Sequence, residues 1–576
     1  MKNVFLGLSG VYGHDAAATL IVDGNIVAAC EEERFIHEKH TGRLPINAID
    51  FCLDYADIEP KNVDFVSFPF NYKSRLEPVL IYNLSVFEER IKYYMDNKTD
   101  IKKIREDAQK IISVEKKIMH AHRDVETYVK NKFPNAEFKV VDHHLAHAAS
   151  SYYLSGFNSS SVLIVDLIGE WATVTKYAAK DNKLIEIDRI YFPDSLGKIY
   201  QTFTKFLGFK PYSDEFKVMG LAAYGTNKYV SFFHDVVHLM PEGRFKVNQD
   251  LMLFCKGIRP EWSERVVDVI GMPKKKDEAF EQRHADIAFG LQELTENVLL
   301  HLVKDVVLKT NESDLCMAGG VALNALANQK IRESGFVKNL FVQPASYDAG
   351  TSLGASIVTY LSEAQKPLKT LNNYYLGPEY SDQEINQVLE KQKIKYELYR
   401  NSFQDLLNII KNDGVVGIFQ GRMEFGPRAL GNRSILASPS NSAMKDILNT
   451  KIKFREEFRP FAPIILEEEV KNYFEYGVSS PYMTQTFTAK PITRRLAPAI
   501  VHEDGTSRIQ TINKNQNSRI YSLLENISPL IGVPILINTS FNLAGDTIVN
   551  TPEDALKTFY RSDIDALVLG DYIIRK

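Results

Sequence analysis

The chain has 576 residues and a mass of 65.5 kDa, which predicts roughly two to four folding units. Its 44% hydrophobic and 25% charged residues are typical of a globular protein with a sizeable core. The 69 Lys and Arg residues nearly balance 73 Asp and Glu residues, giving a net charge of −4. This balance argues against a protein that binds nucleic acid mainly through its charge. The sequence contains no run of about 18 apolar residues, so we expect no membrane-spanning helix.

The four cysteines are scattered and form no C-x-x-C pair. They are Cys30, Cys52, Cys255 and Cys316. This pattern favours buried thiols in a reducing compartment over a disulfide framework or a zinc ribbon. We therefore expect a cytoplasmic protein.

Two segments read as strand–turn–strand units with the same pattern. Residues 3–8 and 17–22 are strand-like, and an Asp-Gly-Asn turn at 23–25 leads into a further strand. A similar arrangement recurs at 161–189. This repetition suggests an α/β protein with an internal duplication, as in the ASKHA fold of actin, sugar kinases and Hsp70.

The remaining periodicity divides the chain further. Residues 84–131 are charged and almost free of Gly and Pro, which predicts one or two long solvated helices. Pro, Gly and Asn then interrupt the pattern near residues 361–382, as expected of a linker. The predicted organisation is a first domain at 1–362 with halves at about 1–160 and 161–362, a linker at 363–382, and a second α/β domain at 383–576.

The densest chemical signal is a pair of histidines four residues apart. On a helix, His143 and His147 would point the same way and could grip a transition metal together. A second HxxxH at 234–238 shows that this spacing alone is weak. Asp166, at a strand end, and Asp348, beside a flexible glycine, could complete an N/O site suited to iron(II), manganese or zinc. Spacing alone does not join Asp348 to the others.

Glycine-containing turns form a second group of candidates. Gly319 and Gly320 join a predicted strand to a helix, where backbone N–H groups can cradle phosphate. Residues 350–354 are similar, but neither segment is a P-loop or a dinucleotide-binding fingerprint. Close packing of the backbone is the favoured interpretation of each turn alone, whereas the two together in one half of the domain favour a nucleotide site.

Basic residues crowd into one C-terminal stretch: Arg422, Arg428, Arg433, Lys453, Arg455 and Arg459. A solvated basic face is the plain interpretation, but these residues alternate with Gly, Pro and aromatic residues. Guanidinium groups bind phosphate in a bidentate manner, so we expect a polyphosphate or acyl-phosphate site here. Ser540 and Asn542 would complete it, although no general base marks Ser540 as a nucleophile.

Eight motifs occur in an order that resembles a known family. They include GHDAAATLIVDG (13–24), EEERF (31–35), HHLAHAAS (143–150), DEFKVMGLAAYG (214–225), GGVALN (319–324), GPRALGNRSILASP (426–439), FREEFRPFAP (454–463) and NTSFN (538–542). Together they resemble the O-carbamoyltransferases of the NodU/CmcH type, which modify antibiotics, toxins and nodulation factors, over nearly the whole chain. The first domain of that family is similar to the tRNA threonylcarbamoyl transferase of ASKHA fold, and its second resembles the YrdC-type threonylcarbamoyl-AMP synthase.

The resemblance implies a two-stage reaction. Carbamoyl phosphate and ATP, the latter with Mg²⁺, would give carbamoyl adenylate in the second domain, and the first domain would transfer the carbamoyl group to a hydroxyl of a small molecule. The implied metal ligands are His143, His147, Asp166 and Asp348, with iron(II) favoured over manganese or zinc. The implied catalytic residues are His14, as base or orienting group, and the tetrad Lys453, Arg455, Ser540 and Asn542. The implied nucleotide and phosphate contacts are Lys217, Gly319, Gly320, Asn324, Arg422, Arg428, Arg433, Arg459 and Arg508.

Two positions depart from the family pattern. Leu167 stands where the family usually has glycine, which puts the local nucleotide geometry in doubt, and Ala223 stands where proline is common. Other hypotheses are a tRNA threonylcarbamoyl-type transferase, a non-catalytic ASKHA nucleotide-binding protein and an HxxxH metallohydrolase. The charge of −4 and the second domain disfavour the first of these. We expect neither a nucleic acid nor a membrane partner and leave a homodimer open.

Overall fold

The computed structural model describes residues 3–11 and 13–576, which form two compact units. The N-terminal unit takes residues up to 27 and 40–370, and the C-terminal unit takes 28–39 and 371–576. The division falls inside strand β3 (Asn25–Glu31). The short segment 28–39, including α1 (Glu33–Ile36), therefore belongs with residues that follow it by more than 300 positions.

The first sheet of the N-terminal unit has five strands in the order β3-β2-β1-β4-β5. The central strand β1 (Val4–Ser9) runs antiparallel to β2 (Ala17–Val22) and parallel to β4 (Phe65–Phe68), and β5 (Glu137–Val140) extends the parallel side. Every residue of β1 and β2 is buried. Strands covered on both faces explain the unbroken apolar runs in the sequence.

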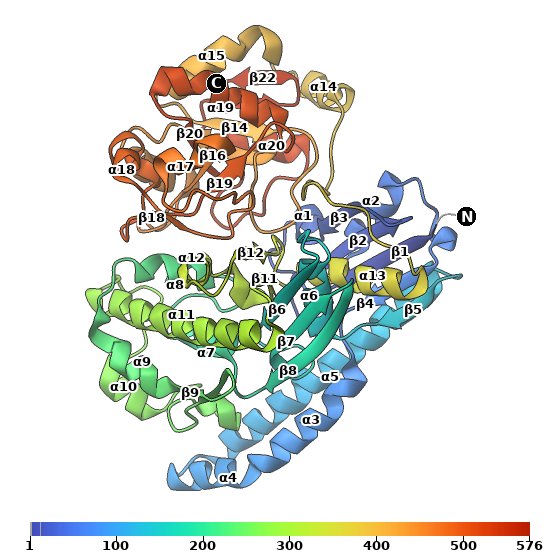
Figure 1. Ribbon diagram of the computed structural model, residues 1–576, viewed down its shortest axis with the longest axis vertical. Coiled ribbons are helices and arrows are strands. Elements are labelled where there is room, and N and C mark those ends of the chain that lie inside the picture. Colours follow the sequence, from blue (N-terminus) through green and yellow to red (C-terminus); the bar gives the residue numbers. More distant parts are fainter. Residues whose placement is uncertain (1–2, 12) are drawn as a thin grey trace. The chain divides into compact units, whose positions relative to one another are not determined.

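A second sheet repeats this arrangement with later residues. Its order is β12-β11-β6-β7-β8, with β6 antiparallel to β7 and parallel to β11. The strands are β6 (Ser159–Val165), β7 (Ala172–Lys180), β8 (Lys183–Tyr191), β11 (Asp314–Ala318) and β12 (Asn339–Val342). Figure 1 shows the two sheets in blue and in green. The matching order and direction of the strands confirm the predicted duplication in an α/β, ASKHA-like unit.

Helices α6 (His143–Tyr152) and α13 (Ala349–Glu363) pack closely within this unit. The contact depends on small side chains: a Cβ placed on Gly354 would lie only 1.7 Å from the carbonyl oxygen of Ala146. A Cβ on Gly7 of β1 would likewise meet the Ser352 carbonyl at 1.9 Å. Both glycines are therefore required by close backbone approach. The resulting layer fixes the start of α13 against α6.

The rest of the N-terminal unit is largely helical. Its elements are α2 (Ile46–Tyr55), α7 (Leu196–Phe206), α8 (Glu215–Ala222), α9 (Val230–Val236), β9 (Val237–Met240), β10 (Arg244–Val247), α10 (Glu264–Ile270), α11 (Gln282–Thr310) and α12 (Ala325–Glu333). Helix α11 spans 29 residues and starts with a reciprocal capping box between Glu281 and His284.

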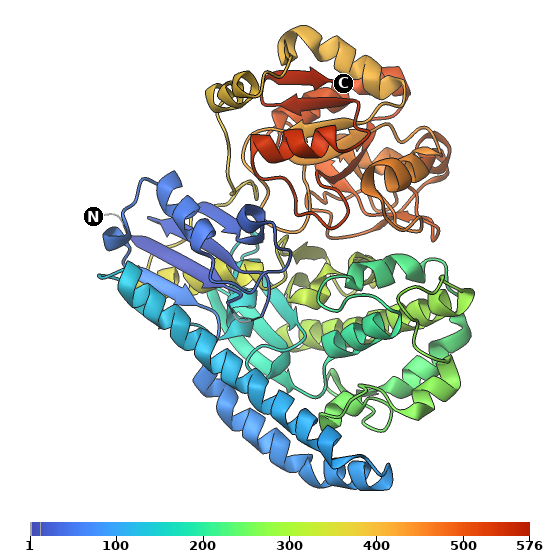
Figure 2. The same cartoon turned by 180° about the vertical axis from the view of Figure 1, so that it is seen from behind.

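Three helices form an arm on the same unit, shown in lighter blue in Figure 2. They are α3 (Tyr72–Ser85), α4 (Phe87–Asp96) and α5 (Ile101–Lys132). Side-chain oxygens of Asn71 and Asp100 cap the first and last of these helices. The sequence of α5 lacks Gly and Pro over 32 residues, which suits a long solvated helix.

The C-terminal unit is built on an eight-stranded mixed sheet in the order β13-β22-β21-β14-β15-β20-β16-β19. The strands are β13 (Glu397–Leu398), β14 (Val416–Phe419), β15 (Arg433–Ala437), β16 (Ala462–Leu466), β19 (Gln510–Ile512), β20 (Ile535–Ser540), β21 (Ala566–Leu569) and β22 (Tyr572–Arg575). Successive residues serve two cores: Ile435 packs in one and Leu436 in the other. A sheet buried on both faces follows.

Helices cover both faces of this sheet. Side chains of α15 (Tyr399–Lys411) and α19 (Ser518–Ile531) join one core, and those of α14 (Asp382–Lys391) and α20 (Pro552–Tyr560) join the other. The shorter elements are α16 (Met444–Ile447), α17 (Val470–Tyr473), β17 (Phe487–Thr488), α18 (Pro491–Leu496) and β18 (Thr506–Ser507).

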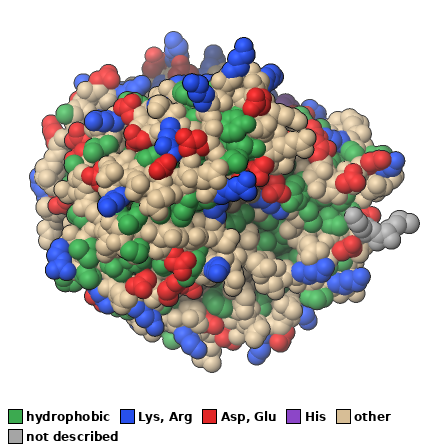
Figure 3. All heavy atoms as spheres, turned by 90° about the horizontal axis from the view of Figure 1, so that it is seen from above, with side chains coloured by type: hydrophobic (Ala, Val, Ile, Leu, Met, Phe, Trp, Pro, Cys, Tyr) green, Lys and Arg blue, Asp and Glu red, His purple; other side chains and the backbone are tan. Residues whose placement is uncertain are grey.

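The described helices include none with both the length and the apolar character needed to span a bilayer. On the face that Figure 3 shows, basic side chains (blue) and acidic side chains (red) are intermixed. This agrees with the nearly balanced composition of the chain.

Candidate active sites

Four side chains from three parts of the sequence converge in the N-terminal unit. Helix α6 carries His143 and His147, while Asp166 follows β6 and Asp348 precedes α13. The Nε2 atom of His143 lies 3.2 Å from Asp166 Oδ2 and 3.6 Å from Asp348 Oδ1. The Nε2 atom of His147 lies 3.7 Å and 3.9 Å from the same two atoms. The structure thus brings together the four side chains that the sequence singles out as ligands.

The donor atoms of this cluster have the spacing that a metal ion requires. Ligand atoms about 2.1 Å from a tetrahedral metal lie about 3.4 Å from one another. The separations here run from 3.2 to 3.9 Å, and the two imidazole Nε2 atoms are 3.2 Å apart. His143 Nδ1 lies 3.1 Å from the Pro69 carbonyl oxygen, to which it donates, so its Nε2 faces the cluster. The residues present therefore fit a divalent metal with N and O ligands.

The electrostatics of the cluster also favour a cation. Burial lowers the pKa of His143, but the charges of Asp348 and Asp166 outweigh burial and raise this pKa to about 10. Burial opposes ionisation of Asp166, yet its hydrogen bond to His143 keeps the pKa of that carboxyl well below its usual range. By contrast, burial and the neighbouring His143 lower the pKa of His144 to about 3. The carboxylates thus hold positive charge on His143, whereas burial leaves His144 neutral.

Local contacts set the orientation of α6. Asp142 caps the helix by accepting from the Leu145 N–H at 2.9 Å. The Glu170 carboxylate accepts from the backbone N–H of His143 at 3.2 Å. Arg189 donates to the second Asp142 oxygen at 2.9 Å. The role of Glu170 as a support for α6 is visible only in the structure.

The Gly319-Gly320 turn, which is predicted to cradle phosphate, contacts a proposed metal ligand. The Gly320 N–H donates to Asp166 Oδ1 at 3.2 Å. Gly319 has φ of 92°, and a Cβ there would lie 2.3 Å from the Val165 carbonyl oxygen. The side-chain oxygen of Asn324 caps α12 by accepting from the Ala327 N–H. These contacts agree with the interpretation that the turn serves close packing of the backbone.

Local contacts also hold Lys217 and Leu167. Lys217 Nζ lies 3.3 Å from Asp214 Oδ1 and 5.7 Å from the centre of the Phe209 ring. The carbonyl oxygen of Leu167 accepts from the Ser195 hydroxyl at 2.7 Å. The backbone at Leu167 is thereby tied to the start of α7.

His14 belongs to a histidine–aspartate–histidine group in the same unit. Its Nδ1 lies 2.5 Å from Asp15 Oδ2, and the other Asp15 oxygen lies 2.7 Å from His40 Nδ1. Burial lowers the pKa of His14, but the Asp15 carboxylate and then the more distant Asp348 and Asp166 raise it to about 10. The His14 side chain is 28% exposed. Sequence inspection missed Asp15 and His40 as partners, although the adjacent His-Asp pair was a usable signal for the first.

An exposed aromatic side chain lies beside His14. The Tyr212 ring centre is 5.2 Å from that of His14, and 49% of Tyr212 is exposed. Its backbone has φ of 63°, which is strained for an aromatic residue. The Glu215 carboxylate holds this conformation by accepting from the Tyr212 N–H at 2.8 Å. Strain stored at an exposed ring beside a candidate catalytic group points to a functional position. Sequence inspection did not single it out.

In the C-terminal unit, Lys453 lies at the centre of a hydrogen-bond network. Its Nζ donates to Asn542 Oδ1 at 2.8 Å and to the Ser540 carbonyl oxygen at 2.5 Å. The Ser540 hydroxyl donates to Asn542 Oδ1 at 2.6 Å. Arg455 is fixed separately: its Nε donates to Asn449 at 2.7 Å, and its guanidinium lies 4.4 Å from the Phe461 ring centre. Three of the four predicted tetrad residues are thus directly linked.

Positive charge accumulates around this network. Burial, and then Arg455 and Arg459, lower the pKa of Lys453 well below its usual value. Burial also lowers the pKa of Arg508, with Arg428, Arg455 and Arg459 adding to the effect. Mutual repulsion among buried cations indicates a place for an anion of several charges.

Two predicted phosphate contacts have other partners. Arg433 is fully buried, lies 3.7 Å from the Phe419 ring centre and donates to backbone carbonyls, including that of Gln420 at 2.7 Å. Arg422 Nη2 donates to the Leu376 carbonyl at 2.5 Å. These arginines hold the loop that precedes β15, and we leave them out of the phosphate site.

Comparisons with known proteins place most of the chain in one family. The family profile described as "Carbamoyltransferase N-terminus" matches residues 4–357, and that described as "Carbamoyltransferase C-terminus" matches residues 407–576. The chain belongs to the carbamoyltransferase family. This confirms the resemblance seen in the motifs and identifies the protein as a carbamoyltransferase.

Two curated relatives are similar to most of the chain, and one solved structure aligns with part of it. Protein sll1178 of Synechocystis is 38% identical over 99% of this chain and 96% of its own length. Nodulation protein NolNO of Sinorhizobium fredii is 33% identical over 99% of this chain and 80% of its own. Component A of (R)-2-hydroxyglutaryl-CoA dehydratase from Acidaminococcus fermentans aligns with 63% of this chain and all of its own at 14% identity, with a TM-score of 0.35.

Proposed function

We propose that the protein is an ATP-dependent O-carbamoyltransferase that works in two half-reactions. The observation that carries this proposal is the presence, in one chain of the carbamoyltransferase family, of a four-donor cluster and a lysine–arginine cluster. The four-donor cluster suits a metal cation, which would assist the transfer step. The lysine–arginine cluster suits the polyphosphate of ATP.

The first half-reaction is assigned to the C-terminal unit, on a YrdC-like pattern. Carbamoyl phosphate and water give carbamate and phosphate. A carbamate oxygen then attacks the α-phosphorus of ATP, the bond to the β-phosphate bridging oxygen breaks, and carbamoyl adenylate and pyrophosphate form. Lys453 and Arg455 would stabilise the negative charge that develops on the phosphates, with Arg428, Arg459 and Arg508 around them. Mg²⁺ would accompany ATP.

The second half-reaction is assigned to the N-terminal unit. A bound divalent metal, with iron(II) favoured over manganese or zinc, would supply Lewis-acid chemistry at His143, His147, Asp166 and Asp348. The acceptor hydroxyl oxygen attacks the carbamoyl carbon. The bond between the carbamoyl carbon and the AMP oxygen then breaks, and the carbamate ester and AMP leave. His14 Nε2 would orient the hydroxyl and take its proton, while Asp15 fixes the ring.

The acceptor is proposed to be a small molecule with a hydroxyl group. The exposed Tyr212 ring beside His14 offers a flat apolar surface for the face of a sugar or an aromatic ring. The net charge of −4 supports a small acceptor over tRNA. Four buried free thiols support a cytoplasmic location.

The test follows each half-reaction separately. Purified protein is incubated with ATP, Mg²⁺ and carbamoyl phosphate, and pyrophosphate and carbamoyl adenylate are measured by chromatography and mass spectrometry. Synthetic carbamoyl adenylate, iron(II) and a panel of sugar and aromatic alcohols then test transfer. We expect pyrophosphate in the first assay and a carbamate ester in the second. Failure to form pyrophosphate with any divalent metal would overturn the proposal. Transfer of the carbamoyl group to tRNA in place of a small alcohol would also overturn it.

A further inference from the structure

The proposed metal ligand His143 is held by two groups that lie outside the donor cluster. Its Nδ1 donates to the Pro69 carbonyl oxygen at 3.1 Å, and its backbone N–H donates to Glu170 Oε1 at 3.2 Å. Pro69 lies between β4 and α3, where the chain enters the helical arm. Groups that contact a ligand in this way fix its orientation, and losing one typically weakens metal binding about 10- to 100-fold.

The Glu170 carboxylate joins the helix of the ligands to the arm. Its Oε1 atom accepts not only from His143 but also from the Asn71 N–H, at 2.8 Å. Asn71 is the N-cap of α3, and His143 is the first residue of α6. Glu170 is 5% exposed, so water competes little for these hydrogen bonds. One buried carboxylate therefore ties the start of α6 to the start of α3.

Arg75, about one turn further along α3, holds the backbone of Glu170. Its Nη1 donates to the Glu170 carbonyl oxygen at 2.7 Å. Its Nε and Nη2 donate to the two carboxylate oxygens of Glu115 on α5, at 3.0 and 2.7 Å. The guanidinium also lies 5.4 Å from the centre of the Trp171 ring. Arginine suits this position because its planar fork can bind a carboxylate through two N–H groups and still donate to a third acceptor.

We propose that Arg75 is a positioning residue for the metal site: together with Glu115 it holds Glu170 in place, and Glu170 holds His143. Arg75 acts through Glu170 and contacts neither the donor atoms nor a substrate. Glu170 also lies four residues after Asp166, so the same contact steadies the segment that leaves a second ligand. The proposal rests on the metal site of the proposed function, and not on the carbamoyl chemistry. It gives the helical arm a part in setting metal affinity.

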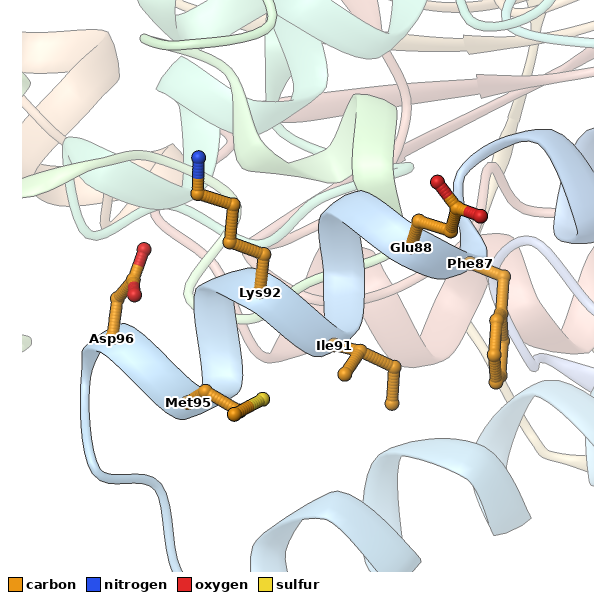
Figure 4. Close-up of a pocket in the computed structure, with 6 residues that line it drawn as sticks. All are labelled: Phe87, Glu88, Ile91, Lys92, Met95 and Asp96. Atoms are coloured by element: carbon orange, nitrogen blue, oxygen red, sulfur yellow. The ribbon is translucent and has the colours of Figure 1, made fainter.

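A purely structural brace is the alternative role for Arg75, and α4 of the same arm offers the control. The side chains that Figure 4 shows on this helix are all exposed: Phe87, Glu88, Ile91, Lys92, Met95 and Asp96. Arg90 attaches α4 to the rest of the unit, because its Nε donates to the Lys256 carbonyl oxygen at 2.7 Å. Arg90 is thus an arginine of the arm that bonds to backbone without contacting Glu170. A brace makes Arg75 and Arg90 equivalent, whereas a positioning role affects metal binding through Arg75 alone.

The affinity of the full-length, metal-free protein for Zn²⁺ alone tests the proposal without ATP or an acceptor. It is measured by competition with a chromogenic chelator, and His147→Ala identifies the signal that belongs to this site. Arg75→Met removes the donors but keeps an apolar stem, so it should weaken Zn²⁺ binding about 10-fold. Glu115→Gln, a milder change at a partly exposed position, should weaken it about threefold, since one neutral oxygen still accepts. Arg90→Met should bind Zn²⁺ as the wild type does.

Two further measurements separate positioning from folding. With cobalt(II) in place of zinc, the visible absorption bands report the ligand geometry, and they should change in Arg75→Met but not in Arg90→Met. Glu170→Ala should weaken Zn²⁺ binding about 30-fold. Glu170→Gln keeps an oxygen that can accept from both N–H groups, so it should restore most of the affinity.

The outcomes distinguish this proposal from the proposed function. Wild-type zinc affinity and an unchanged cobalt spectrum in Arg75→Met would overturn the positioning role and leave the metal site intact. An equal loss of affinity in Arg90→Met would also overturn it, because the arm would then act only as a structural brace. A wild-type protein that binds neither zinc nor cobalt at this site would instead contradict the metal site, and the proposed function would fail with it.

Discussion

The two candidate sites are charged in opposite ways. In the N-terminal unit, buried carboxylates raise the pKa of His143 to about 10. In the C-terminal unit, burial and neighbouring cations lower the pKa values of Lys453 and Arg508. Each site therefore lacks the countercharge that its ligand would bring: a cation in the first and a polyphosphate in the second. Variants that affect one half-reaction but not the other test this comparison.

The largest effect is expected for Lys453→Ala. Lys453 has hydrogen bonds to Ser540 and Asn542 and lies among the arginines, so its loss removes a buried charge from the proposed phosphate site. We expect carbamoyl adenylate formation to fall by about 100- to 1,000-fold. Pyrophosphate release measures this step. Transfer from synthetic carbamoyl adenylate should stay near wild type, and its equal loss would contradict the separation of the two sites.

The converse variant is His147→Ala. His147 is fully buried and points its Nε2 at Asp166 and Asp348, so alanine leaves one donor missing. We expect metal content and transfer from synthetic adenylate to fall at least about 100-fold, while pyrophosphate formation is retained. Elemental analysis checks the metal independently of activity. The matched control is His144→Gln, whose ring lies outside the donor set. A His147→Ala protein with full metal content would contradict the assignment.

A smaller effect is expected for Asp15→Asn. The Asp15 carboxylate contacts both His14 and His40 and is the nearest group that raises the pKa of His14. Removing its charge lowers that pKa, so the limb of the pH–rate profile governed by His14 should move to lower pH. Transfer should fall by about 10- to 100-fold through loss of ring orientation. The profile is measured with synthetic carbamoyl adenylate. An unmoved profile would remove His14 from the mechanism.

The arginines of the C-terminal stretch should separate into two groups. Arg428→Ala removes one charge beside Arg508 and should weaken ATP binding about 10-fold with little change in melting temperature. Arg433→Ala removes a fully buried guanidinium that donates to several carbonyls, so it should lower the melting temperature sharply. Calorimetric binding and thermal unfolding distinguish the two. Similar behaviour of both variants would contradict the division.

Much of the fold could be predicted because its signals are local. Buried strands such as residues 4–9 appear as apolar runs, and the same strand–turn–strand pattern at two places predicted the duplication. The early segment 28–39 could not be assigned to the C-terminal unit, because its partners lie more than 300 residues away. Contacts of that separation leave no periodic pattern in the sequence.

The candidate sites were predictable to the extent that motifs mark them. The motifs supplied His143, His147, Asp166 and Asp348, but only the α6–α13 contact through Gly354 explains how Asp348 reaches the histidines. Motifs also could not distinguish Arg433, which donates to backbone carbonyls, from arginines whose charges lower the pKa of Arg508. Tyr212 escaped notice because its strained backbone is visible only in three dimensions.

The smallest effect concerns protons, and it tests the opposite charges directly. Since burial and like charges depress the pKa of Lys453, bound ATP should raise this pKa, so ATP binding at a pH between the free and bound values takes up a fraction of a proton. Metal binding in the N-terminal unit should instead release protons, because imidazole ligands must be deprotonated. Calorimetry in buffers of different ionisation enthalpy measures the number of protons taken up with ATP and the number released with the metal. His147→Ala should abolish the release and leave the uptake. Absence of proton uptake on ATP binding would show that Lys453 is already fully charged, and the contrast between the two sites would fail at that residue.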